Sequence, residues 1–269
     1  MKPDLIQKIY QGSLAVGLAA GAAMESLTPQ SKPANMRVGT GRATFCGDGS
    51  PLTQVSWLAF ESDFDPKEID DIESFFKGRA STWEYNLTPY SDPKLLPALI
   101  ERGWSDVQYE NSMWRDLGDL SDVPVARNSK IEVRPASASE LRTFIDVSMR
   151  GFFGDEIPPA CATIGDIVMN SPGTIPFLAL IDGRPAGAAT VSVFEDTVYL
   201  GGAATLPEFR GQGVQTALLA YRLAHAAGLG CDLALCECLP GSQSQRNQER
   251  AGFRVAYSKI VLTGPKETD

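Results

Sequence analysis

The chain has 269 residues, 43% of them hydrophobic, and a formal net charge of -9 at pH 7 with a sequence pI near 4.8. This length is enough to bury a sizeable core in one large domain or two small ones. The negative charge argues against a general nucleic-acid binder, which needs a basic surface to neutralise phosphates. It is compatible with a cationic, amine-bearing substrate.

The five cysteines are odd in number and scattered: Cys46, Cys161, Cys231, Cys236 and Cys238. The stretch "CDLALCEC" has no paired metal-ligand spacing and predicts a buried strand, in which free cysteine packs as a small hydrophobe. We therefore expect reduced thiols in a cytoplasmic protein, and no metal site.

The N-terminal segment "DLIQKIYQGSLAVGLAAGAAMESL" predicts a packed amphipathic helix. Its apolar residues recur at near-helical spacing: Leu5, Ile9, Leu14, Leu18 and Met24. The alternative is a signal-peptide core, but Asp4 interrupts the basic start that such a segment requires. No apolar run is long enough to span a bilayer, so we expect no membrane partner.

The first half contains a predicted strand at "TQVSWLAF" (53–60), which leads into an acidic segment at residues 61–71. This segment has six Asp or Glu residues against one lysine, a net charge of -5, and would repel a phosphate. Asp65 followed by Pro66 predicts a helix start. The first half is therefore interpreted as a scaffold or lid.

Residues 81–117 and 230–262 follow one pattern, which suggests an internal repeat. In both, a strand reaches a proline, a serine follows two residues later (Ser91, Ser242), and a helix ends in Glu-Arg and a glycine-aromatic pair. We predict two copies of one αβ unit, a degenerate copy at 1–125 and a second at 130–269. Chance similarity of two ordinary αβ segments stays open as the alternative.

In the second half the predicted order is β-α-α-β-β-β-α-β-α-β. A strand at 130–135 precedes a helix that begins with the capping box Ser137–Glu140, and a second short helix lies at 158–170. Three strands occupy 174–205, with tight turns at Asp182-Gly183 and Glu195-Asp196. This pattern predicts a mixed α/β fold in which each unit is a mostly antiparallel sheet flanked by helices.

The stretch "LPEFRGQGVQTALL" (206–219) takes a strand through a glycine-rich turn directly into a helix. Such a helix start exposes unpaired N–H groups that favour an anion, and Arg210 adds positive charge. Gly211 and Gly213 permit close approach. A loop that binds a nucleoside triphosphate would need a lysine-serine or lysine-threonine pair after the glycines, but Val214-Gln215 follows here. A dinucleotide-binding fingerprint would need a third glycine, which is missing.

With the strands before it and "SQRNQERAGFRVAY" after it, this stretch resembles the GCN5-related N-acetyltransferases (GNAT). That family's signature is Gln or Arg, two residues, Gly, one residue, and Gly or Ala. Here Arg210 and Gly213 match, and Gln215 stands where the signature has a small residue. The resemblance covers residues 130–269, and the chain is similar to tandem-repeat members with a degenerate N-terminal copy.

The resemblance implies acetyl-CoA, or another acyl-CoA, as the acyl donor and no metal. Its pyrophosphate would rest on the amides of 211–216, and its pantetheine arm would pair with the preceding strand, which splays from its neighbour. The residues expected to bind it are Ala203, Ala204, Thr205, Arg210, Gly211, Gln212, Gly213, Val214, Gln215, Thr216, Ser244 and Asn247.

Candidates for proton transfer are few. The one histidine, His225, lies about 18 Å along the helix from Gly213. It is too far from the expected cofactor site to serve in a catalytic triad. Many relatives carry a tyrosine that can protonate the leaving thiolate, and an asparagine earlier in the chain. At these two positions this chain has Gln248 and Gly241. Tyr257 is the candidate acid, although a structural role is the alternative.

For the base, Glu156 would lie at the acceptor wall, whereas Glu195 and Asp196 are interpreted as solvated turn residues. Phe152 and Phe153 would either line the acyl pocket or belong to the core.

The function expected from the sequence is transfer of an acetyl group from acetyl-CoA to a small-molecule or peptide amine, by direct attack. Two alternatives stay open: a non-catalytic acyl-CoA-binding protein, and a structural tandem domain without a ligand. The acceptor, the acyl chain length and the oligomeric state do not follow from the sequence.

Overall fold

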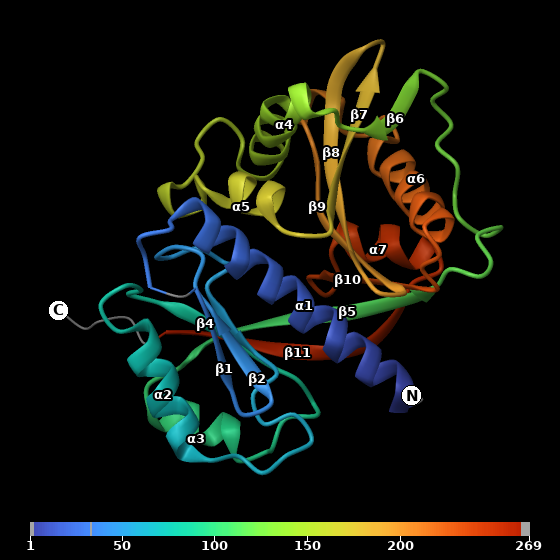
Figure 1. The fold of residues 1–269 in the computed structure, drawn as a ribbon. Coiled ribbons are helices and arrows are strands. Elements are labelled where there is room, and N and C mark those ends of the chain that lie inside the picture. Colours follow the sequence, from blue (N-terminus) through green and yellow to red (C-terminus); the bar gives the residue numbers. More distant parts are fainter. Residues whose placement is uncertain (1–2, 33, 265–269) are drawn as a thin grey trace. The chain divides into compact units, whose positions relative to one another are not determined.

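The computed structural model describes residues 3–32 and 34–264 (Figure 1). By the contacts between its own residues, the chain divides into two compact units. The first comprises the described residues up to 111, residues 170–172, and those from 257 onward; the second comprises 112–169 and 173–256. Two long strands, β5 (Asp106–Asp116) and β11 (Arg254–Gly264), each pass through both units. The predicted domains at 1–125 and 130–269 stay a prediction.

The first unit contains both helices and short strands. The elements are α1 (Pro3–Leu27), β1 (Asn35–Val38), β2 (Gly41–Thr44), β3 (Gln54–Ser56), α2 (Pro66–Phe76), β4 (Trp83–Leu87) and α3 (Leu95–Glu101). Strands β1, β2 and β3 are antiparallel neighbours, β3 pairs with β4 in parallel, and β4 pairs with β11 antiparallel.

Two predictions in the first unit are confirmed. The N-terminal segment is a helix, α1, that contacts β2 and buries Ile6 and Ile9. Helix α2 begins after Asp65, whose side chain accepts a hydrogen bond from the amide of Lys67. None of the described helices combines the length and apolar character needed to cross a membrane.

The predicted strand at 53–60 is too long, because the observed strand β3 ends at Ser56. Beyond it, Trp57, Ala59 and Glu61 have positive φ angles of 61°, 52° and 47°. Left-handed residues at alternate positions turn the chain out of a sheet. The buried Trp57 ring packs edge-on against Phe60 in this irregular segment.

The two segments of the suspected repeat share their order but not all their details. Each is strand–helix–strand: β4–α3–β5, and β10 (Leu233–Cys238), α7 (Gln243–Arg250) and β11. Ser242 caps α7 by accepting from the amide of Gln245, whereas α3 follows Lys94 without a side-chain cap. Ser91 lies outside the helix, and its hydroxyl is buried without a partner. Common descent of the two segments stays a prediction.

The second unit has the predicted element order. Its remaining elements are β6 (Ile131–Pro135), α4 (Leu141–Phe153), α5 (Ile164–Asn170), β7 (Thr174–Ile181), β8 (Arg184–Phe194), β9 (Thr197–Thr205) and α6 (Val214–Gly228). The strands lie in the order β5-β10-β9-β8-β7-β6; the β9–β10 pair is parallel, and the β9–β8, β8–β7 and β7–β6 pairs are antiparallel. Both hairpin turns, Asp182-Gly183 and Glu195-Asp196, are present. The fold is mixed α/β, with a mostly antiparallel sheet flanked by helices.

Helices α4 and α6 cover opposite faces of this sheet (Figure 1). A Cβ atom at Gly187 of β8 would lie 2.6 Å from the side chain of Val214 in α6. A Cβ atom at Gly151 of α4 would lie 2.6 Å from Ala204 of β9, the partner of Ala188. Because neighbouring residues of a strand point to opposite faces, these contacts place the two helices on opposite sides. Glycine lets both helices approach closely.

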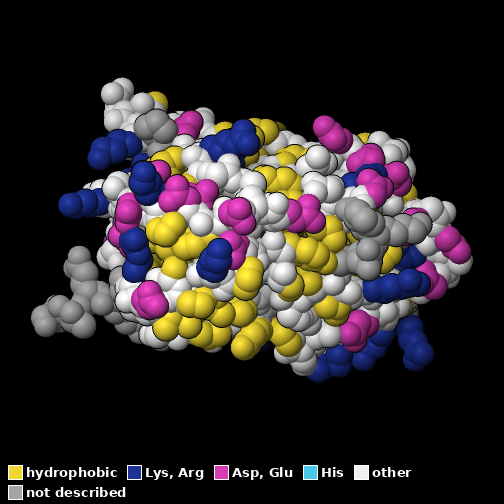
Figure 2. All heavy atoms as spheres, turned by 90° about the horizontal axis from the view of Figure 1, so that it is seen from below, with side chains coloured by type: hydrophobic (Ala, Val, Ile, Leu, Met, Phe, Trp, Pro, Cys, Tyr) yellow, Lys and Arg dark blue, Asp and Glu magenta, His cyan; other side chains and the backbone are white. Residues whose placement is uncertain are grey.

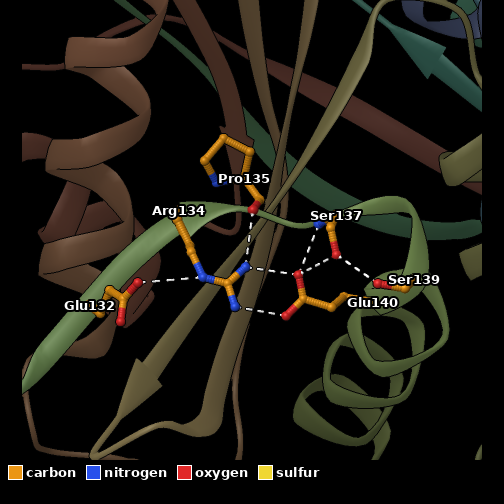
Figure 3. Close-up of polar contacts among 6 residues, drawn as sticks. All are labelled: Glu132, Arg134, Pro135, Ser137, Ser139 and Glu140. Carbon is orange, nitrogen blue, oxygen red and sulfur yellow. Dashed lines mark hydrogen bonds and ion pairs between the residues drawn. The ribbon is translucent and has the colours of Figure 1, made fainter.

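The start of α4 is fixed by one polar cluster (Figure 3). Arg134 of β6 forms a two-pronged ion pair with Glu140, at 2.7 and 2.8 Å. Glu140 also accepts from the hydroxyl and the amide of Ser137, which completes the predicted capping box. Because Arg134, and then Ser137, stabilise the carboxylate, the pKa of Glu140 lies well below its ordinary value of 4.5.

Gly187→Ala is expected to lower the free energy of unfolding by about 1–3 kcal/mol, because the added methyl group overpacks the α6–β8 contact. Urea denaturation measures the change. Gly228→Ala is the control, since no atom lies within 4 Å of its Cβ position, and it should be neutral or stabilising. Equal stability of Gly187→Ala and the wild type would contradict the close packing.

Glu140→Gln is expected to lower the melting temperature at neutral pH and to matter less as the solution is acidified. A carboxylate whose folded pKa is depressed stabilises the fold above its unfolded pKa, and this contribution is lost as pH falls toward the folded pKa. Thermal melts of wild type and variant should therefore approach each other progressively as the pH falls below the ordinary pKa of 4.5. A double-mutant cycle with Arg134→Gln isolates the interaction between Arg134 and Glu140. A difference in melting temperature between wild type and Glu140→Gln that does not change with pH would refute the stabilising role of the carboxylate.

Candidate functional site

A cavity of about 590 Å³ opens in the second unit beside the start of α6. Its walls come from α4, β9, the glycine-rich turn at 210–213 (the glycine turn), α6 and α7. The residues that line it are Gly151, Ala203, Thr205, Phe209, Arg210, Gly211, Gly213, Val214, Gln215, Thr216, Leu219, Arg222, Gln243, Ser244, Asn247 and Gln248. All of the twelve predicted cofactor residues except Ala204 and Gln212 are among them.

The glycine turn presents a row of main-chain donors to this cavity. Gly211 and Gly213 have φ angles of 76° and 91°, a conformation that favours glycine, and Gly213 is the N-cap of α6 without a side-chain cap. In the part of the chain that the structure describes, the amides of 211–216 have no hydrogen-bond acceptor. Six consecutive unpaired N–H groups at a helix N-terminus form an anion site.

The strand before the turn parts from its neighbour, as the resemblance implied. Pairing of β9 with β10 runs from Thr197 to Tyr199, although β9 continues to Thr205 and β10 to Cys238. On the other edge of β9 the register with β8 shifts near Gly202, which has a φ of 52°. The edge of β9 beyond Tyr199 is therefore open toward β10, where an extended ligand could add as a strand.

Arg210 fixes the turn to two neighbouring elements. Its Nε donates to the carbonyl oxygen of Thr205 at 3.3 Å, and its Nη2 donates to that of Gly151 in the last turn of α4 at 3.1 Å. A guanidinium at a helix C-terminus also compensates the negative end of the helix dipole. Arg210 makes no ion pair with a carboxylate among the described residues, so its charge remains for a ligand.

Arg222 is the second cation of the cavity, and it is not among the residues predicted from the sequence. Only 1% of its surface is exposed. Nε donates to the carbonyl oxygen of Leu218, and Nη1 donates to those of Thr190 and Gly201. Burial lowers the pKa of Arg222 to about 10, so the group stays positively charged at neutral pH.

The sequence did carry a signal for Arg222. Together with Val214 and Leu218 it repeats every four residues, and all three are buried. A cation on the buried stripe of an apolar helix is unusual, and its spacing alone predicts that it lies inside the molecule.

Two glutamines occupy positions where the resemblance leads one to expect other residues. Gln215 donates from Nε2 to the hydroxyl of Thr205 at 2.8 Å, which ties the first turn of α6 to the end of β9. Gln248 is 9% exposed, and its Oε1 is buried without a partner. An unpaired buried carbonyl at a cavity wall is a group that a ligand donor can satisfy.

Helix α7 contributes the remaining polar wall. Ser244 and Asn247 line the cavity, and their contact with a cofactor stays a prediction. The Oδ1 of Asn247 accepts from Gln243 and Arg250 at 2.8 and 3.2 Å, which holds this side chain in place. Gly241, where many relatives carry asparagine, has a φ of 72°, and this left-handed backbone accounts for glycine there.

The charge of the cavity is opposite to that of the protein. The chain has a net charge of -9, and its acidic side chains are scattered among basic and apolar ones on the face drawn in Figure 2. The residues that line the cavity include two arginines and no Asp, Glu, Lys, His, Cys or Tyr. The site is thus built for an anion, and no lining side chain titrates near neutral pH.

The residues predicted for proton transfer do not line this cavity. Tyr257 belongs to the first unit, where its ring packs against Trp57 and Tyr90. Glu156 is exposed in the loop after α4. His225 packs against the ring of Phe177. No finding tests Tyr257 as the acid or Glu156 as the base, and both stay predictions.

Phe152 is exposed and Phe153 half-buried, and neither lines the cavity. All five cysteines are buried, and none of them is in a disulfide. Among the described residues, no group of three or more His, Cys, Asp or Glu side chains is placed to hold a metal ion.

A protein-family model matches the part of the chain that forms this site. Residues 141–253 match the model of the acetyltransferase (GNAT) family, a segment that contains α4, the glycine turn, α6 and α7. The match supports that family for this part of the chain. No match is found among curated proteins.

Solved structures share the fold over nearly the whole chain. A GCN5-related N-acetyltransferase from Kribbella flavida is 21% identical with a TM-score of 0.65, and the similarity covers 93% of this chain and 96% of that one. A second from Sphaerobacter thermophilus is 13% identical with a TM-score of 0.60, covering 94% and 93%. A tandem GNAT protein from the clavulanic acid biosynthesis pathway is 14% identical with a TM-score of 0.56, covering 96% of each chain. At these identities the likeness shows the fold.

Gln248→Met is expected to stabilise the ligand-free protein by about 1–3 kcal/mol, because it removes a buried carbonyl that has no donor while keeping the side-chain volume. Urea denaturation without ligand measures the change. Gln108→Met, at an exposed position of β5, is the control and should be close to neutral. Destabilisation by Gln248→Met would mean that the carbonyl is satisfied in the free protein.

Proposed function

We propose that the chain transfers an acetyl group from acetyl-CoA to an amine, by direct attack of the amine on the thioester. The observation that carries this is the row of unpaired amides at 211–216, beside Arg210 and facing a cavity without acidic residues. A pyrophosphate satisfies such a row and gains from the helix dipole. The family match at 141–253 supports the reaction class.

In this proposal each wall of the cavity has a part in holding the donor. The amides of 211–216 bind the pyrophosphate, and Arg210 adds charge. The open edge of β9 at Ala203–Thr205 pairs with the amides of the pantetheine arm. Ser244 and Asn247 contact the donor from α7, and the buried oxygen of Gln248 accepts one of its N–H groups.

The second candidate function is a non-catalytic acyl-CoA-binding protein. Two observations favour it. The side chains that line the cavity include none that exchanges a proton near neutral pH, and Gln248 stands where many relatives carry a tyrosine that acts as the general acid. In either case we propose a cytoplasmic protein with a degenerate GNAT-like copy at 1–125. For the enzyme, a small-molecule or peptide amine is the partner.

Isothermal titration with coenzyme A tests the binding site that both candidates share. We expect heat at submillimolar ligand, and an affinity at least tenfold weaker, about 1.4 kcal/mol, in Arg210→Glu. Arg142→Glu, an exposed arginine of α4 that does not line the cavity, is the matched control and should bind as the wild type does. Unchanged affinity in Arg210→Glu would remove its role, and no heat would refute the site.

A thiol-release assay with acetyl-CoA and a panel of amines separates the two candidates. Release that depends on an amine supports the enzyme. Binding of coenzyme A without turnover of any amine supports the binding protein.

A further inference from the structure

The buried guanidinium of Arg222 has no anionic partner among the described residues. Of its three nitrogens, Nε and Nη1 donate to main-chain carbonyl oxygens. Nη2 has no acceptor among the described residues and is not fully buried, so it opens toward the cavity that Arg222 lines. No carboxylate pairs with the guanidinium among the described residues. A buried cation of this kind is unfavourable until a ligand brings negative charge.

The titratable groups around Arg222 do not supply that charge. Cys236 of β10 is the one that interacts with it, and burial raises the pKa of this thiol well above its ordinary value, so it stays neutral. On the same strand, Glu237 accepts a hydrogen bond from the hydroxyl of Tyr199 at 3.1 Å. Within the cavity lining the only other charged side chain is Arg210, a second cation.

The position of Arg222 places it at the reacting end of the proposed donor. Its partner Gly201 lies four residues before Thr205 on β9, about 13 Å along the strand at 3.3 Å per residue. Thr205 lies beside the glycine turn, to which Gln215 connects it. A donor whose pyrophosphate rests on the turn, and whose arm follows β9, therefore brings its thioester toward Gly201. This step depends on the function proposed above.

We propose that Arg222 stabilises the thiolate of coenzyme A as it leaves. In the transfer, the amine nitrogen bonds to the acyl carbon and the carbon–sulfur bond breaks, with its electron pair going to sulfur. The ammonium proton passes to water. No lining side chain can protonate the sulfur near neutral pH, so the guanidinium balances the charge instead. Because the thioester is neutral and the thiolate is anionic, this interaction favours the transition state over the bound donor.

The experiment measures the thiol pKa of coenzyme A bound to the full chain, and it needs no acceptor. The ultraviolet absorbance of the thiolate is followed against pH, with the S-methyl coenzyme A complex as the reference. We expect a thiol pKa at least one unit below that of free coenzyme A. Arg222→Gln, which loses the charge but keeps a polar N–H donor at this position, should restore the free value. Arg222→Lys, which keeps the charge, should retain most of the shift.

Arg210→Gln is the matched control, since it should weaken coenzyme A binding and leave the thiol pKa of the complex lowered. A wild-type complex with the thiol pKa of free coenzyme A overturns the inference but not the binding site. An equal shift in Arg222→Gln overturns it too. A third outcome also overturns it: Arg222→Gln leaves the thiol pKa of the complex unchanged and weakens only the binding of succinyl-CoA. Arg222 would then bind a carboxylate on the acyl group. Absence of coenzyme A binding would refute the proposed function and this inference together.

Discussion

The second unit is organised around six main-chain amides that have no acceptor in the described protein. Folding normally pairs such groups, because an unsatisfied donor away from water is costly. Here the turn keeps the amides of 211–216 together, through two left-handed glycines and Arg210, whose hydrogen bonds join β9, the turn and α4. The arrangement is understandable if the missing acceptor is an anion from outside. The other features of the site follow from making room for it.

That room is made by giving up strand pairing and side-chain volume. Strands β9 and β10 pair only as far as Tyr199, and beyond it the edge of β9 that faces β10 is open. Compensation comes from close packing elsewhere. Gly151 and Gly187 let α4 and α6 approach β8 and β9 from opposite faces, so the open strand is held between two helices. A rigid open edge keeps the binding conformation without an ordering cost when the ligand arrives.

Local chemistry could be predicted from the sequence where a single residue type decides it. The capping box at Ser137–Glu140, the N-cap Asp65 and the turn Asp182-Gly183 depend on near neighbours, and the structure has all three. The end of β3 at Ser56 could not be predicted, because the left-handed Trp57 is held by tertiary packing rather than by propensity. Ten of the residues that line the cavity are among those expected from the sequence to bind the donor, and six of these ten belong to the motif at 210–216. The members missed, such as Gly151, come from elements that only the fold brings together.

The two arginines of the cavity act under different conditions, and this difference bears on the chemistry. Arg210 is exposed, so water and salt weaken its charge and suit it to holding a phosphate that is anionic throughout. Arg222 is buried, where the effective dielectric constant is low and the same charge acts more strongly over the same distance. A strong, unscreened cation is of most use against charge that appears only during a reaction, since a permanent anion can be bound at the surface. The burial of Arg222 therefore weighs toward an enzyme and away from a protein that only binds the donor.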